Sequence, residues 1–167
     1  MFTSTVSNKE KFETLQALFL GITPAARSLN VKDFPTYEEL LQTAKEQSDS
    51  EECQLSFISG YLKASSVFFD HITNGKLFPL ATSKNTPFGN ILLNLTIEEK
   101  VELAKVNRLV EKKWYNLSIE FNDRASGTIS LVSRSTNMVD HEYEFTNEPN
   151  NNFVVNLRKI SEKIDSL

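Results

Sequence analysis

The sequence contains few of the residues from which catalytic and metal sites are most often built. Its 167 residues include one Cys, two His, one Trp and five Gly. A single Cys excludes an intramolecular disulfide, and the scattered Gly residues do not form the Gly-rich loop that binds phosphate. No stretch approaches the roughly 18 consecutive apolar residues that a membrane-spanning helix needs. We therefore expect a protein that is not an enzyme, needs no metal or cofactor and does not act at a membrane.

The apolar segment 15–22 matches a secretory signal only in part. Glu10 and Glu13 occupy the region where such a signal carries positive charge, and Gln16 interrupts the apolar run. The single Cys53 suits a reducing compartment. Together these features predict a soluble, cytoplasmic protein.

The composition is that of an ordinary globular domain, with 40% apolar and 24% charged residues. The length suits one domain spanning residues 1–167. The 12 Phe residues predict a core rich in aromatic contacts. The formal net charge is −4, and Lys and Arg are scattered along the chain. Because binding to phosphates requires clustered basic residues, we expect no direct nucleic-acid partner.

Helix starts are marked by a capping box, in which a hydroxyl and a carboxylate three residues later satisfy each other's backbone N–H groups. The pattern occurs as Ser7-x-x-Glu10, Thr36-x-x-Glu39, Ser48-x-x-Glu51 and Thr96-x-x-Glu99. Each box precedes apolar residues at helical spacing. The sequence therefore predicts helices over 8–21, 36–47, 51–73 and 97–112, with a loop over 75–90.

The third of these segments has an alternative interpretation. Ser59-Gly60 could form a two-residue turn between strands over 53–58 and 61–69. The stripe formed by Leu55, Ile58, Leu62, Phe69 and Ile72 favours the helix.

After residue 113 the apolar period changes to two, which is typical of half-buried strands. We expect strands over 114–121, 128–133 and 139–145, joined by short turns as an antiparallel meander. The apolar side of the last strand should carry Val139, His141, Tyr143 and Phe145. An amphipathic helix over 152–166 should close the fold. The predicted class is α+β, with a helical part over 1–112, a β-meander over 113–146 and the closing helix.

Two Asp-His pairs, Asp70-His71 and Asp140-His141, are the residues best suited to acid–base or metal chemistry. They do not supply the three or four ligands of a zinc site at a known spacing. Cys53 lacks a local signature of a catalytic nucleophile, and it could equally be a small core residue. A small hydrolase or metal-dependent enzyme using Asp70, His71 or His141 stays open as an alternative hypothesis.

The predicted meander has a side opposite its apolar face that carries several carboxylates. Glu120 would join Asp140, Glu142 and Glu144 there. A negative sheet face can attract a basic protein and steer its approach. Trp114, the only Trp, begins the first predicted strand, where it alternates with the inward residues, and it belongs to a residue type enriched in interface hot spots. These five residues are the candidate partner-binding site.

The segment from Glu98 to Leu131 contains a charged helix, the strand Trp114-Tyr115-Asn116-Leu117-Ser118-Ile119-Glu120-Phe121, a Gly-containing turn and a second strand. In this it resembles the YezG/EsaG-like immunity proteins, which are small antitoxins of bacterial nuclease toxins. The resemblance implies a non-enzymatic protein that neutralises a toxin by binding it. It implies no residue-level role beyond a structural one for Trp114.

The leading hypothesis is thus a cytoplasmic protein-binding protein, an immunity protein that neutralises a basic bacterial toxin through an acidic surface. A third hypothesis is a module that binds an apolar ligand in a cavity lined by Phe residues. A cavity bordered by Phe68, Phe69 and Phe121 would favour it.

Overall fold

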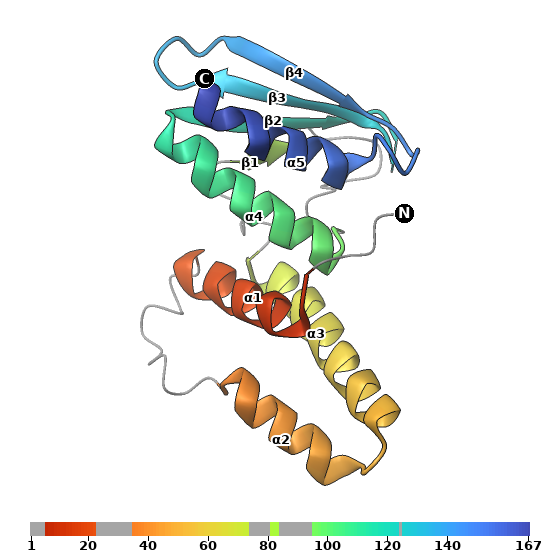
Figure 1. Ribbon diagram of the computed structural model, residues 1–167. Coiled ribbons are helices and arrows are strands. Elements are labelled where there is room, and N and C mark those ends of the chain that lie inside the picture. The colour runs from red at the N-terminus through yellow and green to blue at the C-terminus, as the bar shows by residue number, and fades with distance from the viewer. Residues whose placement is uncertain (1–5, 23–34, 74–80, 84–94, 124) are drawn as a thin grey trace. The chain divides into compact units, whose positions relative to one another are not determined.

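The computed structural model describes residues 6–22, 35–73, 81–83, 95–123 and 125–167. The contacts within the chain group these residues into two compact units (Figure 1). The helical unit comprises the described residues within 5–77, and the sheet unit comprises those within 78–167. The α+β class is confirmed, whereas the single-domain organisation stays a prediction.

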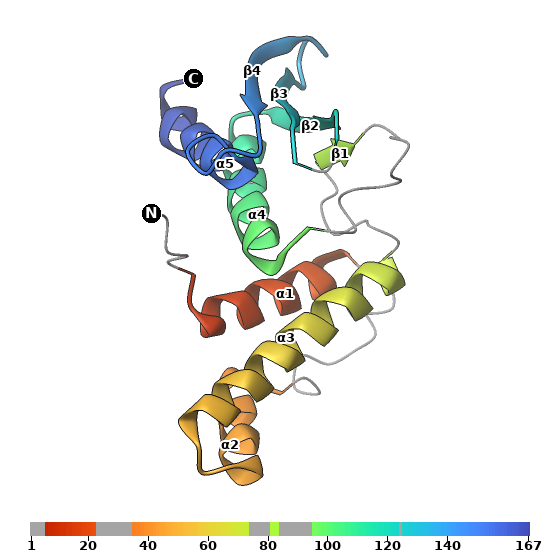
Figure 2. The same cartoon turned by 90° about the vertical axis from the view of Figure 1, so that its right-hand side faces the viewer.

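The helical unit contains α1 (Asn8–Ile22), α2 (Tyr37–Gln47) and α3 (Glu51–Thr73). The hairpin alternative is wrong, because α3 runs without interruption through Ser59 and Gly60. Figure 2 shows α1 crossing the C-terminal half of α3 and α2 lying beside its N-terminal half.

Phe12 joins the three helices of this unit. Its ring centroid lies 5.9 Å from that of Tyr37 on α2 and 6.2 Å from that of Tyr61 on α3. Nearby, the rings of Phe19 and Phe69 stack with centroids 4.4 Å apart. Such pairs stabilise a helix interface beyond the apolar area that they bury.

The capping boxes identified three of the four helix starts. Thr36 with Glu39 and Thr96 with Glu99 form complete boxes, and Ser7 accepts a hydrogen bond from the Glu10 N–H. The prediction for Ser48 is wrong. Ser48 ends α2 as its C-cap, and its hydroxyl accepts from the N–H of Ser50. Ser50 directly precedes α3 and caps its first turn, since its hydroxyl accepts from the Cys53 N–H.

The sheet unit contains four strands in the order β1-β2-β3-β4: β1 (Ala81–Ser83), β2 (Tyr115–Phe121), β3 (Gly127–Ser133) and β4 (Val139–Phe145). The last three form the predicted antiparallel meander. β1 corrects the prediction of a loop over 75–90, because it pairs in parallel with β2. Three residues are too few to show an alternating pattern, so this strand has no periodic signal in the sequence. The rest of that predicted loop, residues 75–80 and 84–90, lies outside the described residues.

One face of the meander is covered by α4 (Ile97–Lys112) and α5 (Phe153–Lys163), and the 3-10 helix η4 (Ile164–Ser166) follows α5 (Figure 1). The sheet side chains beneath these helices are fully buried: Leu117, Ile119, Ile129 and Leu131. Among the described helices, none combines the length and the apolar character needed to cross a bilayer.

Three Phe residues attach α5 to one end of the sheet. Phe153, the first residue of α5, lies edge-on to Phe145 with centroids 5.2 Å apart, and Phe145 lies edge-on to Phe121 at 5.3 Å. Farther along, Arg158 of α5 forms an ion pair of 3.3 Å with the buried Glu102 of α4. The closing helix is thus tied both to the sheet and to α4.

Candidate functional site

The side of the meander opposite α4 and α5 carries the polar side chains of alternate strand positions. We call this surface the outer face, and the strand register assigns to it Asn116, Ser118, Glu120, Thr128, Ser130, Val132, Val139, Glu142 and Glu144. In Figures 1 and 2 the two helices of the sheet unit, α4 and α5, both lie on the other side of β2, β3 and β4. An antiparallel sheet tolerates such an arrangement because one face suffices for the core.

The carboxylates gather at one end of the outer face. Thr128 on the central strand pairs with Glu120 on one side and with Glu144 on the other, and Glu142 pairs with Ser130. Glu120 and Glu144 are therefore about 10 Å apart at the backbone, and Glu142 and Glu144 about 7 Å apart. All three are exposed. We call these residues, Glu120, Glu142 and Glu144, the acidic end.

Among the described residues that the strand register places on the outer face, those outside the acidic end are neutral. The spacings of the three carboxylates are comparable with the Debye length of about 8 Å at physiological salt, so their fields add. The acidic end is therefore a concentrated negative patch on a chain of mild net charge.

Asp140 does not extend this patch as predicted. The register shifts between Leu131 and Val132, so that these neighbours pair with His141 and Val139 and leave Asp140 as the extra residue of a bulge. The Asp140 carboxylate accepts a hydrogen bond of 3.0 Å from the hydroxyl of Tyr115. Tyr115 belongs to the series of alternate residues that carries Leu117 and Ile119. A bulge redirects the side chains around it, and here it separates Asp140 from Glu142 and Glu144.

The bulge also moves Val139. The period-two pattern predicted Val139 on the apolar side, but it lies opposite Val132 on the outer face and is 50% exposed. Met138, which precedes it, is 66% exposed.

Trp114 lies at the same end of the sheet, in the turn from α4 to β2. Its side chain is 66% exposed, and its φ of 62° is in the left-handed region that bulky residues rarely adopt. Its carbonyl accepts from the N–H of Arg134, whose guanidinium lies 5.1 Å from the centroid of the indole ring. This stacking is a cation–π contact that holds the exposed ring in place. We call Trp114, Met138 and Val139 the apolar end.

Along β4, Val139 of the apolar end lies three residues from Glu142 and five residues from Glu144, which are distances of about 10 Å and about 17 Å. An apolar group containing Trp and Met beside a charged group has the composition typical of protein interfaces. Of the five candidate residues, Glu120, Glu142 and Glu144 lie together in the acidic end. Trp114 lies at the opposite end of the sheet, and Asp140 is hydrogen-bonded to Tyr115. Sequence reasoning missed Met138 and Val139, because the bulge that exposes Val139 leaves no mark in the apolar pattern.

Comparison with known proteins adds no relative. No family model, curated protein or solved structure matches the chain. The resemblance of residues 98–131 to the immunity proteins therefore stays a prediction.

The Asp-His pairs belong to different units. Asp70 is buried and His71 exposed on α3, whereas His141 is half-buried on β4. Within the described part of the chain, no three Asp, Glu, His or Cys side chains gather as metal ligands would. Cys53 is exposed in the first turn of α3, so it is not the small core residue that one interpretation expected.

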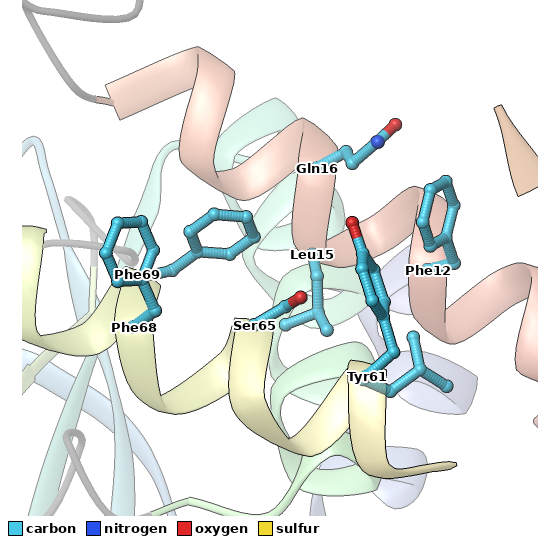
Figure 3. A pocket seen from close by; sticks show the side chains of 8 residues that line it. Phe12, Leu15, Gln16, Tyr61, Ser65, Phe68 and Phe69 are labelled. Atoms are coloured by element: carbon cyan, nitrogen blue, oxygen red, sulfur yellow. The ribbon is translucent and has the colours of Figure 1, made fainter. Parts of the chain in front are cut away.

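A second candidate site is an apolar pocket between α1 and α3, with a volume of about 190 Å³ (Figure 3). We call it the α1–α3 pocket, and it is lined by Phe12, Leu15, Gln16, Tyr61, Leu62, Ser65, Phe68 and Phe69. Ser65 and Leu15 lie between two aromatic groups, Phe68 with Phe69 and Tyr61 with Phe12.

The pocket agrees in part with the expected cavity. Phe68 and Phe69 line it, but Phe121 belongs to the sheet unit and lines a separate, more polar hollow with Phe145 and Phe153. The sequence does contain a pattern that indicates an aromatic surface in the helical unit. Aromatic residues of α3 lie outside the apolar stripe that its core needs, as well as within it.

Proposed function

We propose that this chain is a non-catalytic protein-binding protein that uses the outer face of its sheet to bind a basic protein. The observation that carries the proposal is the acidic end, where Glu120 on β2 and Glu142 and Glu144 on β4 are exposed on the two strands that flank β3. A partner with Lys and Arg at matching spacings would gain favourable interactions there and would approach faster at low salt.

The apolar end supplies the second component of such an interface. Exposed charges contribute little each, whereas a Trp covered by a partner is often a hot spot. The guanidinium of Arg134 packs on the indole ring of Trp114, so part of the side-chain freedom of Trp114 is already lost before a partner binds. We propose that Trp114, Met138 and Val139 provide most of the affinity, and that the acidic end provides orientation and selectivity.

The kind of partner follows from the resemblance to immunity proteins. A toxin that acts on nucleic acid carries a basic surface for phosphates, and an acidic protein can occupy that surface. We propose that the chain is a cytoplasmic antitoxin of this type from a bacterium. The same negative charge disfavours direct binding to nucleic acid or to an anionic membrane.

The test compares two triple variants as bait for binding proteins in extracts of the native host. The first replaces the acidic end, Glu120→Lys, Glu142→Lys and Glu144→Lys. The control makes the same charge change at exposed positions on three helices, Glu13→Lys, Glu46→Lys and Glu162→Lys. We expect the wild type and the control to capture the same basic protein and the first variant to lose it. Equal capture by all three would contradict the proposal.

Neutralisation itself needs a separate test. The captured protein is assayed for nuclease activity with and without the purified chain. The captured protein could be basic and yet have no activity that the chain inhibits. In that case the chain would still be a protein-binding protein, but it would not be an antitoxin.

A further inference from the structure

The α1–α3 pocket lies within the helical unit, and the proposed binding of a basic protein by the sheet does not use it. Its walls are two well-formed helices, and none of its lining residues is charged. Burying an unpaired ion against such a surface is costly. The chemistry of the walls therefore selects an uncharged ligand.

The walls also select an aromatic ligand. Phe12 and Tyr61 lie on one side, Phe68 and Phe69 lie on the other, and Leu15 lies between them (Figure 3). Aromatic rings gain from offset or edge-on contact with other rings, beyond the burial of their area. Phe68 is 57% exposed although it lines the pocket, so a ligand in contact with it would remove apolar surface from water.

The size of the pocket restricts the ligand to about one ring. Pockets for drug-sized ligands measure roughly 300–1,000 Å³, whereas this one measures about 190 Å³. An engineered apolar cavity of about 150 Å³ in another protein binds benzene. The α1–α3 pocket therefore has room for a single ring with a small substituent.

Polar groups at the pocket can orient such a substituent. The Ser65 hydroxyl lies between the two aromatic groups. The side-chain amide of Gln16 donates to the carbonyl of Pro35 at 3.0 Å, which fixes its orientation at the α1 side of the pocket. A hydroxyl or an indole N–H on the ligand would find partners here, as in the few placed polar groups of most ligand sites.

We propose that the α1–α3 pocket binds a small neutral molecule built on one aromatic ring with a hydrogen-bonding substituent, of the phenol or indole class. The proposal does not depend on the outer face, so each can fail without the other. The full-length chain is titrated with phenol, indole and toluene, and with benzoate and benzylammonium as charged counterparts, while the methyl resonances of Leu15 and Leu62 are followed by NMR.

We expect saturable shifts with phenol or indole at dissociation constants below about 1 mM. Toluene should bind more weakly, and the two ions should produce no saturable shift. Ser65→Leu fills the pocket and should weaken binding at least tenfold. Ser59→Leu, the same change at an exposed position of α3, should leave binding unchanged. If Ser65→Leu disturbs folding, Ser65→Val serves in its place, with circular dichroism as the check.

Three results would overturn the proposal. They are the absence of saturation with every neutral probe, equal binding of benzoate and phenol, and equal affinity of the Ser65 and Ser59 variants. A pocket that takes only a side chain of a partner protein would give the first of these results, with shifts of Leu15 and Leu62 appearing on addition of that protein alone.

Discussion

The hydroxyl of Tyr115 donates a 3.0 Å hydrogen bond to Oδ2 of Asp140, from the first residue of β2 to the bulge of β4. The contact crosses the central strand and joins residues 25 positions apart. It therefore holds the bulge that takes Asp140 away from the acidic end and exposes Val139.

This contact predicts a pH dependence for Tyr115. The hydrogen bond to Asp140, with some burial and the negative charge of Asp140, raises the pKa of Tyr115 above its ordinary value of 10.0. The folded chain thus holds the proton more tightly than the unfolded chain does. The contribution of this hydrogen bond to the stability of the folded chain is complete below pH 10. It is lost as the pH rises through the pKa of Tyr115 in the folded chain.

The measurement is an NMR titration of the Tyr115 ring between neutral and strongly alkaline pH. Asp140→Ala should bring the midpoint back toward 10.0. An unchanged midpoint in that variant would mean that the hydrogen bond does not form in solution.

Gly60 and Gly127 predict opposite effects of the same substitution. A Cβ at Gly60, in the interior of α3, would meet no atom within 4 Å. Gly60→Ala should therefore raise the free energy of unfolding by about 0.5–1 kcal/mol, because Ala loses less backbone entropy in a helix. At Gly127 a Cβ would run into the carbonyl of Glu120 and lie 2.9 Å from the Cα of Phe121. Gly127→Ala should lower stability by about 1–3 kcal/mol.

Urea unfolding followed by circular dichroism measures both changes, with hydrogen exchange of α3 amides as a local check for Gly60. Loss of stability in Gly60→Ala would show that α3 is not a regular helix at this position.

The start of α3 gives a third prediction. Ser50→Ala removes the hydroxyl that caps the Cys53 N–H and should cost about 1 kcal/mol. Thr96→Ala, at the complete capping box of α4, should cost a similar amount of about 1 kcal/mol. Ser48→Ala removes only a hydrogen bond in the connecting turn and should cost less than either. Amide exchange in the first turn of α3 separates the cases, and the reverse order for Ser48 and Ser50 would support the capping box that the sequence suggested.

Much of this fold follows from local sequence signals. The helix from Glu51 to Thr73 is long enough for its apolar stripe to outweigh the Ser59-Gly60 turn signal. The strands of the meander alternate clearly in β2 and β3, where every second residue is buried from Leu117 to Phe121 and from Gly127 to Leu131. These patterns involve only residues that are close together in the sequence, so they can be recognised without the structure.

The rest depends on contacts between distant residues. The pairing of β1 with β2 places Ala81 opposite Leu117, and the three residues of β1 carry no sequence pattern that predicts it. The bulge depends on how β4 aligns with β3, so the sequence alone assigned Asp140 and Val139 to the wrong sides. The α1–α3 pocket is likewise a product of helix packing, because Leu15 and Ser65 come together only when α1 lies across α3.

Recognition of a basic protein by the acidic end is the property on which the proposed function depends. The decisive measurement is the dissociation constant of the captured partner, determined by titration calorimetry at two salt concentrations, for the wild type, the acidic-end variant and the helix-surface control. We expect reversal of Glu120, Glu142 and Glu144 to weaken binding by at least two orders of magnitude, with thermal stability retained. The control should bind like the wild type, and wild-type binding should weaken as salt increases. Equal dissociation constants for the two triple variants, or binding that is insensitive to salt, would show that the acidic end does not recognise the partner.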